Sequence, residues 1–160
     1  MTFFEDIVVG ESVLVGRHTF TAEGIKAFAR RFDPQHFHVD EDAAAQSHFG
    51  ALCASGWQTA IVWMRLMVDH RRAQAEAARA RGERVAQIGP ALGFRDLKWL
   101  KPVYVGDTID YRIEVTETRA SNSRPAHGLV TLLTTGTNQK GELVISFVST
   151  SFVERRGKDS

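Results

Sequence analysis

Asp33 and His38 are the residues of this chain best suited to chemistry, because a carboxylate and an imidazole stand only five positions apart. Pro34 disfavours helical geometry at Asp33, so we expect a non-helical link from which both side chains face one cleft. Such a pair can hold and polarise a water molecule, as general acid–base catalysis requires. A structural role also fits, in which Asp33 caps a turn and His38 bonds to backbone.

A metal site is a second interpretation of this segment, because His36, His38, Asp40 and Glu41 crowd together with a His-x-His spacing. The closest metal-binding pattern, that of the cupins, requires a glycine where this chain has Arg30, and an acidic residue one position later than Glu41. Cupin ligands also stand on strands, whereas the residues before this segment have a helical pattern. We therefore expect no metal site.

The segment Ala54-Ser55-Gly56-Trp57 is a second candidate, because it reads as the start of a buried helix. The first N–H groups of a helix lack intrahelical partners, and Gly56 lets a ligand approach the backbone closely. These donors could stabilise the oxyanion of an enolised thioester. In the structural alternative, Ser55 is only an N-cap and Gly56 only a packing residue.

Helical elements must position these residues. Residues 11–20 read as a strand, and Thr21 then offers an N-cap oxygen to a helix that ends near Phe32. The acidic run at Asp40 favours a second short helix that stops at Gly50. The short link that carries Asp33 and His38 lies between these two helices.

A third helix is predicted from Ser55, and its residues 57–68 are apolar almost all round, so we expect it to be enclosed on several sides. An Ala- and Arg-rich extension over 70–81 continues it to Gly82.

The second half of the chain changes to a strand pattern, most clearly at residues 109–116, where apolar and polar residues alternate. The other expected strands are residues 94–100, 128–137 and 143–153. Helices and strands are segregated along the chain, so the fold class is α+β. We expect a single domain over residues 1–160, with a four-strand antiparallel meander curved around the third helix.

Composition excludes several classes of protein. Lys plus Arg number 20 and Asp plus Glu 19, giving a net charge of +1 that marks neither nucleic acid nor an anionic membrane as a partner. A lone cysteine, Cys53, suits a cytoplasmic location. The acidic N-terminus does not resemble a signal peptide, and the most apolar run, 60–68, is too short to cross a bilayer.

The run Phe32-Asp33-Pro34-Gln35-His36-Phe37-His38-Val39-Asp40, followed by Ala44, Phe49-Gly50 and Ala54-Ser55-Gly56, resembles the MaoC-like (R)-specific enoyl-CoA hydratase family. Downstream, Trp99-Leu100-Lys101-Pro102-Val103 and Gly106-Asp107-Thr108 look like a further segment of that family.

This resemblance implies a hotdog fold, an antiparallel sheet around a long central helix, in a homodimer or higher homo-oligomer. It implies that Asp33 and His38 activate water for addition to a 2-enoyl thioester, or for the reverse dehydration, while the Gly56 N–H holds the thioester oxygen. Coenzyme A or an acyl carrier protein enters only as part of the substrate, and no other cofactor is expected. We expect the substrate to contact Phe37, Phe49, Ser55 and Trp57.

The chain departs from the family motif at Phe32, Gln35, His36 and Ser55, where the family has Gly, Asn, Pro and His. A serine of the central helix in some members corresponds to Met64. These changes leave the acyl group undefined. Two alternatives stay open, a hotdog thioesterase and a non-catalytic subunit that binds acyl thioesters. The first would need a carboxylate near the start of the central helix or on that helix, whose first turns offer Gln58 and Thr59.

Overall fold

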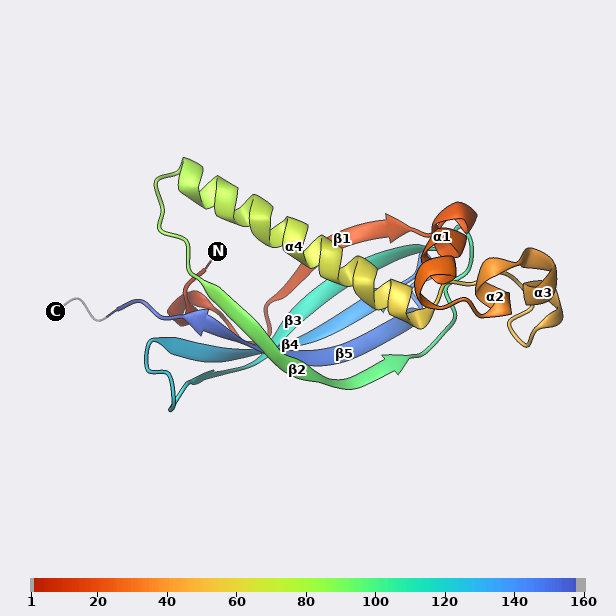
Figure 1. Cartoon of the computed structure of the whole chain (residues 1–160). Helices are drawn as coiled ribbons and strands as arrows, with labels where there is room; N and C mark the ends of the chain where they lie inside the picture. The colour runs from red at the N-terminus through yellow and green to blue at the C-terminus, as the bar shows by residue number, and fades with distance from the viewer. Residues whose placement is uncertain (1, 158–160) are drawn as a thin grey trace.

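A computed structural model describes residues 2–157, which form one five-stranded antiparallel sheet and one long helix packed against it (Figure 1). The strands are β1 (Ser12–Thr19), β2 (Ile88–Trp99), β3 (Thr108–Ala120), β4 (His127–Thr137) and β5 (Leu143–Glu154). Their order in the sheet is β1-β3-β4-β5-β2. The α+β class is confirmed, but the four-strand meander is wrong: only β3, β4 and β5 follow one another, and β2 pairs with β5 at one edge.

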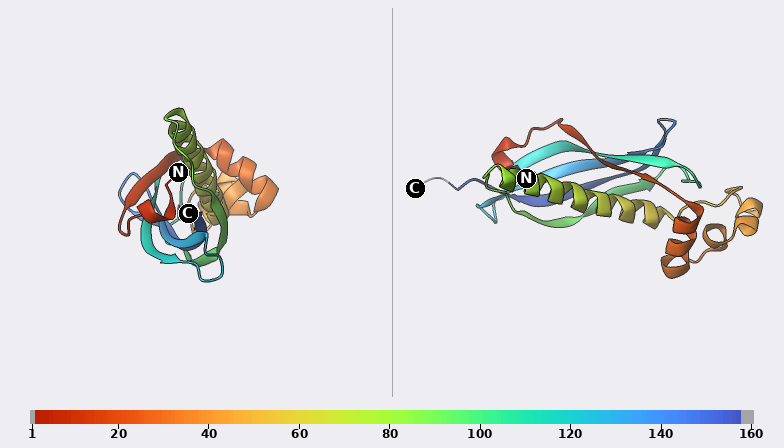
Figure 2. Two further views of the ribbon diagram at one scale, coloured as in Figure 1. Left: turned by 90° about the vertical axis from the view of Figure 1, so that its left-hand side faces the viewer. Right: turned by 90° about the horizontal axis from the view of Figure 1, so that it is seen from above.

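The helix α4 (Gly56–Ala80) begins where expected, because the Ser55 side chain accepts a hydrogen bond from the Trp57 N–H. Figure 2 shows the sheet curving around this helix. Thr59, Trp63 and Met67 lie four residues apart on its buried face, a spacing that brings them to one side of a helix. The described helices include none long and apolar enough to cross a membrane.

The expectation that α4 is enclosed on several sides is wrong. Trp57, Ile61, Met64 and Val68 are between 43% and 57% exposed, and they repeat at helical spacing on a face that the sheet does not cover. An apolar pattern shows that a face avoids water, but it does not show whether this chain or another one covers it.

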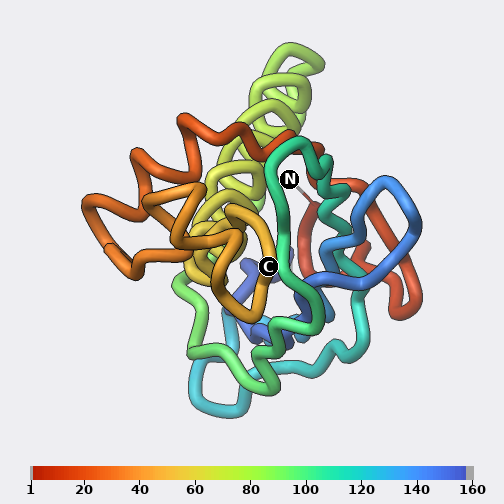
Figure 3. The backbone as a smooth tube through the Cα atoms, turned by 90° about the vertical axis from the view of Figure 1, so that its right-hand side faces the viewer, coloured from red at the N-terminus to blue at the C-terminus, as the bar shows by residue number. Residues whose placement is uncertain are grey.

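Three shorter helices gather beside the start of α4: α1 (Ala22–Phe32), α2 (His36–Val39) and α3 (Glu41–Gln46) (Figure 3). Thr21 and Asp40 cap α1 and α3, as the sequence predicts. The link expected to be non-helical contains the single turn α2, because Pro34 prevents helix only at the residue before it.

The segment before α4 is pinned to the loop before β3. The Ala54 N–H donates to Val103 O at 2.8 Å, Cys53 and Tyr104 form an isolated antiparallel bridge, and the Tyr104 hydroxyl donates to Phe49 O at 2.9 Å. These bonds hold Phe49, Cys53 and Ala54, and with them the entry to α4, against the loop before β3.

Candidate active site

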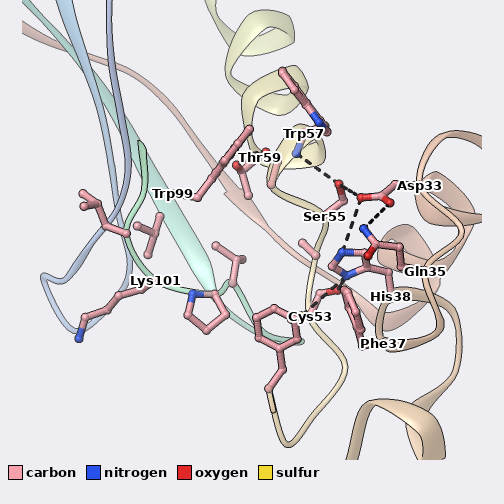
Figure 4. A pocket seen from close by; sticks show the side chains of 17 residues that line it. Asp33, Gln35, Phe37, His38, Cys53, Ser55, Trp57, Thr59, Trp99 and Lys101 are labelled. Carbon is pink, nitrogen blue, oxygen red and sulfur yellow. Dashed lines mark hydrogen bonds and ion pairs between the residues drawn. The ribbon is translucent and has the colours of Figure 1, made fainter. Parts of the chain in front are cut away.

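Asp33 and His38 meet at the junction of α1, α2 and α4 (Figure 4). Asp33 is the C-cap of α1, and His38 stands on the single turn of α2. His38 Nε2 lies 3.6 Å from Asp33 Oδ2, and the imidazole is buried. The expected pair therefore shares one site.

The His38 ring is held by its other nitrogen. Nδ1 lies 2.7 Å from the carbonyl oxygen of Cys53. Because a carbonyl oxygen only accepts hydrogen bonds, Nδ1 carries the proton of the neutral ring and Nε2 keeps its lone pair toward Asp33. The Cys53 thiol lies 3.7 Å from the same Nδ1, and burial raises the pKa of that thiol to about 11, so the thiol stays protonated at neutral pH.

Asp33 is fixed by two side-chain donors. The Ser55 hydroxyl donates to Oδ2 at 2.6 Å, and Gln35 Nε2 donates to Oδ1 at 2.8 Å. Burial alone would raise the pKa of Asp33, but these two hydrogen bonds and the nearby His38 ring outweigh it and lower that pKa below its usual value. Asp33 is therefore an anion at neutral pH.

The start of α4 supplies a free backbone donor. Ser55 Oγ accepts from the Trp57 N–H at 3.3 Å, whereas the Gly56 N–H donates to no acceptor among residues 2–157. The Trp99 ring lies against Gly56, because Trp99 Nε1 donates to Gly56 O at 2.8 Å. A Cβ at position 56 would stand 2.7 Å from that ring, so the site requires glycine there.

These groups open onto a cavity of about 430 Å³. All seven residues singled out in the sequence line it: Asp33, Phe37, His38, Phe49, Ser55, Gly56 and Trp57. Ser55 differs from the expectation in one respect, because its hydroxyl is occupied by Asp33 and by the Trp57 N–H.

Gln35 and Trp99 are site residues that sequence reasoning did not assign. Gln35 was only a departure from a motif, although its amide lies two positions from Asp33 and donates to it. Trp99 belongs to the downstream segment that resembles the family, and that segment was the available signal. Lys101 also lines the cavity, but its ammonium is paired with Glu142 at 2.5 Å and points away from Asp33 (Figure 4).

The residues of the possible metal site have other roles. His36 is exposed, Asp40 caps α3, and Glu41 pairs with Lys26 at 2.5 Å. Residues 2–157 contain no group of three or more His, Cys, Asp or Glu side chains able to hold a metal ion.

Comparison with known proteins gives consistent matches. The family described as "MaoC like domain" matches residues 7–138. A MaoC-like dehydratase from Rhodospirillum rubrum superposes with a TM-score of 0.81 at 37% identity, covering 99% of this chain and 100% of that one. A Mycobacterium tuberculosis protein with a double hotdog fold has a TM-score of 0.72 at 21% identity, over 99% of this chain and 46% of that one, which shows the fold alone.

Mesaconyl-CoA hydratase from Cereibacter sphaeroides is 42% identical over 65 residues, which are 41% of this chain and 19% of the hydratase. The chain thus matches about a fifth of that relative's length.

Proposed function

The chain belongs to the MaoC-like domain family and has its hotdog fold, and from this membership we propose that it is a hydro-lyase that adds water to 2-enoyl thioesters or removes it from 3-hydroxyacyl thioesters. The observation that carries the proposal is the separation of 3.6 Å between His38 Nε2 and Asp33 Oδ2. With the His38 ring neutral, both atoms are acceptors, so they do not satisfy each other. One water molecule that donates a hydrogen bond to each of these two atoms satisfies both acceptors.

The bound water then faces the substrate with its lone pairs. As its oxygen bonds to Cβ, His38 Nε2 accepts a proton, because the hydrogen bonds to Asp33 make that carboxylate the weaker base. The double-bond electrons move to the thioester oxygen. His38 returns its proton to Cα, so the elements of water are added and the enzyme is regenerated. Dehydration follows the same steps in reverse.

The Gly56 N–H is proposed to stabilise the thioester oxygen as negative charge develops. It is the first N–H of a long helix, where the helix dipole also favours an anion. A single oxyanion donor of this kind contributes about 10²- to 10³-fold in rate. No redox cofactor is proposed, because adding water to a conjugated double bond transfers protons and needs no electron acceptor. No metal is proposed, because the Gly56 N–H takes the place of a Lewis acid at the thioester oxygen.

We propose that the cavity accommodates a short acyl group. Phe37, Phe49 and Val144 give it apolar walls. Beyond Thr59, its innermost residue on α4, the next turn places Trp63 edge-on to Phe147, with ring centroids 4.7 Å apart. The relative named mesaconyl-CoA hydratase supports coenzyme A as the carrier. We also propose a cytoplasmic location, since Cys53 is a buried free thiol.

A homodimer is proposed from the exposed apolar face of α4 and the free edge strand β2, which carries the exposed Leu92 and Phe94. Pairing two β2 edges would satisfy their free backbone groups and cover the adjacent helix face.

The thioesterase alternative has less support. Gln58 and Thr59 occupy the first turns of α4, and their side chains donate to Gly24 O and Gly56 O. Asp33 is the single carboxylate among the residues that line the cavity.

The test measures the absorbance of crotonyl-CoA and of longer 2-enoyl-CoAs over time. A thiol reagent in a parallel assay detects any free coenzyme A that is released. For the wild type we expect the conjugated absorbance to fall without release of thiol. Asp33→Asn should show no such fall, whereas Asp42→Asn, which changes an exposed carboxylate of α3, should behave like the wild type. Thiol release would favour the thioesterase. Binding of acyl-CoA without any reaction would favour the non-catalytic subunit.

A further inference from the structure

A second cavity, of about 150 Å³, lies between the C-terminal half of α4 and the sheet. In Figures 1 and 2 the end of α4 rises away from the strands. Arg71, at the mouth of this cavity, stands 15 positions after Gly56, which is about 22 Å along a helix.

An aromatic wall separates this cavity from the candidate active site. Thr59 lines the first cavity and Met67 lines the second, and both belong to the buried face of α4. Trp63 stands midway between them, is 5% exposed, and packs edge-on against Phe147. No residue lines both cavities. The second cavity is therefore a separate space.

The interior of the second cavity is mostly aliphatic, and the buried Ser151 of β5 is its polar exception. Its walls include Met67 of α4 and side chains from four strands: Ile88, Ile113, Val130, Leu132 and Val153. An apolar cavity of about this volume accepts a ligand of roughly six carbon atoms. The apolar walls thus suit a short hydrocarbon group.

Arg71 gives the mouth of the cavity an uncompensated positive charge. Its guanidinium is half-buried and takes part in no side-chain hydrogen bond or ion pair among residues 2–157, and burial lowers its pKa. By contrast, Arg17, Arg65 and Arg81 each pair with a carboxylate. Glu11 and His70 also line the mouth, but Glu11 is exposed and forms no ion pair with a cationic side chain of residues 2–157. A partly desolvated guanidinium gains most from an anion that forms paired hydrogen bonds with it.

We propose that this cavity binds a monocarboxylate with an apolar tail of about six carbon atoms, its carboxylate on Arg71 and its tail against Met67. A carboxylate fits better than a phosphate, because one guanidinium matches its single charge and two oxygens. The site is independent of the proposed reaction, since it shares no residue with the first cavity.

The methionine methyl groups provide a direct test. Met67 lines the cavity, whereas Met64 lies on the exposed face of the same helix. In protein labelled with ¹³C at the methionine methyls, with resonances assigned from Met64→Leu and Met67→Leu, we expect sodium hexanoate to shift the Met67 signal saturably and to leave Met64 unmoved. Acetate should leave both signals unmoved, and 1-hexanol should bind at least tenfold more weakly than hexanoate.

Two arginine variants test whether the positive charge of Arg71 binds the carboxylate. Arg71→Gln should weaken hexanoate at least tenfold, to the level of hexanol, while Arg72→Gln, which changes the adjacent exposed arginine, should leave its affinity unchanged. Equal binding of hexanoate and hexanol, an unaffected Arg71→Gln, or a shift of Met64 alone would overturn the proposal. Asp33→Asn should bind hexanoate normally, so that failure of the hydratase assay and failure of this proposal remain distinguishable.

Discussion

The Ser55 hydroxyl donates to Asp33 Oδ2 at 2.6 Å across 22 positions of the chain, and Ser55 Oγ also accepts a hydrogen bond from the Trp57 N–H at the start of α4. One buried side chain therefore links the helix that carries the proposed oxyanion donor to the carboxylate proposed to hold the water. Ser55 is a positioning residue in this scheme, since its hydroxyl is already occupied.

Ser55→Ala should lower kcat at least tenfold, because Asp33 loses a donor and the start of α4, which carries the free Gly56 N–H, loses the cap on its Trp57 N–H. Loss of the cap should also lower the free energy of unfolding by about 0.5–2 kcal/mol. Thr21→Ala is the matched control, since Thr21 caps α1 without contacting Asp33; it should lose comparable stability and keep its kcat. Equal kcat values for the two variants would assign Ser55 a capping role alone.

The stability contributed by Asp33 should depend on pH. Its pKa in the folded protein lies below the usual value of 3.8, so the unfolded chain binds the proton more readily. The contribution is fully present above the unfolded pKa and is lost as the pH falls through the folded pKa. Measured by urea unfolding between pH 7 and pH 3, the stability of the wild type relative to Asp33→Asn should be constant down to about pH 5 and then decrease. An increase on acidification would contradict the lowered pKa.

Gly56→Ala should destabilise the protein by about 1–3 kcal/mol through overpacking, because the new Cβ would stand 2.7 Å from the Trp99 ring. Displacing Trp99 also removes its hydrogen bond to Gly56 O, so we expect kcat to fall about 10²-fold, the size of one oxyanion donor. Gly157→Ala, whose Cβ meets nothing within 4 Å, is the control for both measurements. Because this variant keeps the backbone N–H at position 56, normal turnover in Gly56→Ala would show that moving Trp99 does not disturb the proposed oxyanion donor.

Trp63→Leu should widen the range of acyl groups, because it opens the wall between the two cavities. We expect the ratio of kcat/KM for decenoyl-CoA to that for crotonyl-CoA to rise at least tenfold, a difference of about 1.4 kcal/mol. Met64→Leu changes the neighbouring residue on the exposed face and should leave the ratio unchanged. A wild-type enzyme that already prefers decenoyl-CoA would show that Trp63 does not limit the acyl group.

Local features of the fold and site could be predicted from the sequence. Thr21, Asp40 and Ser55 cap helices because each side-chain oxygen reaches an N–H two or three residues away. The short spacing of Asp33 and His38 likewise brought them to one junction, with Pro34 between them.

Contacts between distant segments could not be predicted in this way. Trp99 reaches Gly56 across 43 positions, and β2 pairs with β5 although β3 and β4 lie between them in the sequence. Neither contact leaves a periodic signal in the sequence. The turn α2 was missed because its four residues are too few to show a helical repeat.

Met64→Glu should dissociate the proposed dimer. Met64 lies 43% exposed in the apolar face formed with Trp57, Ile61 and Val68, and a carboxylate there would have to be buried without a partner. Sedimentation should show a dimer for the wild type and a monomer for Met64→Glu. Leu14→Glu is the matched control, because Leu14 is similarly exposed at 41% but lies on β1, at the opposite edge of the sheet; this variant should stay dimeric. Dissociation by Leu14→Glu alone would instead place the interface on the β1 edge, and a monomeric wild type would leave the apolar face of α4 to a different partner.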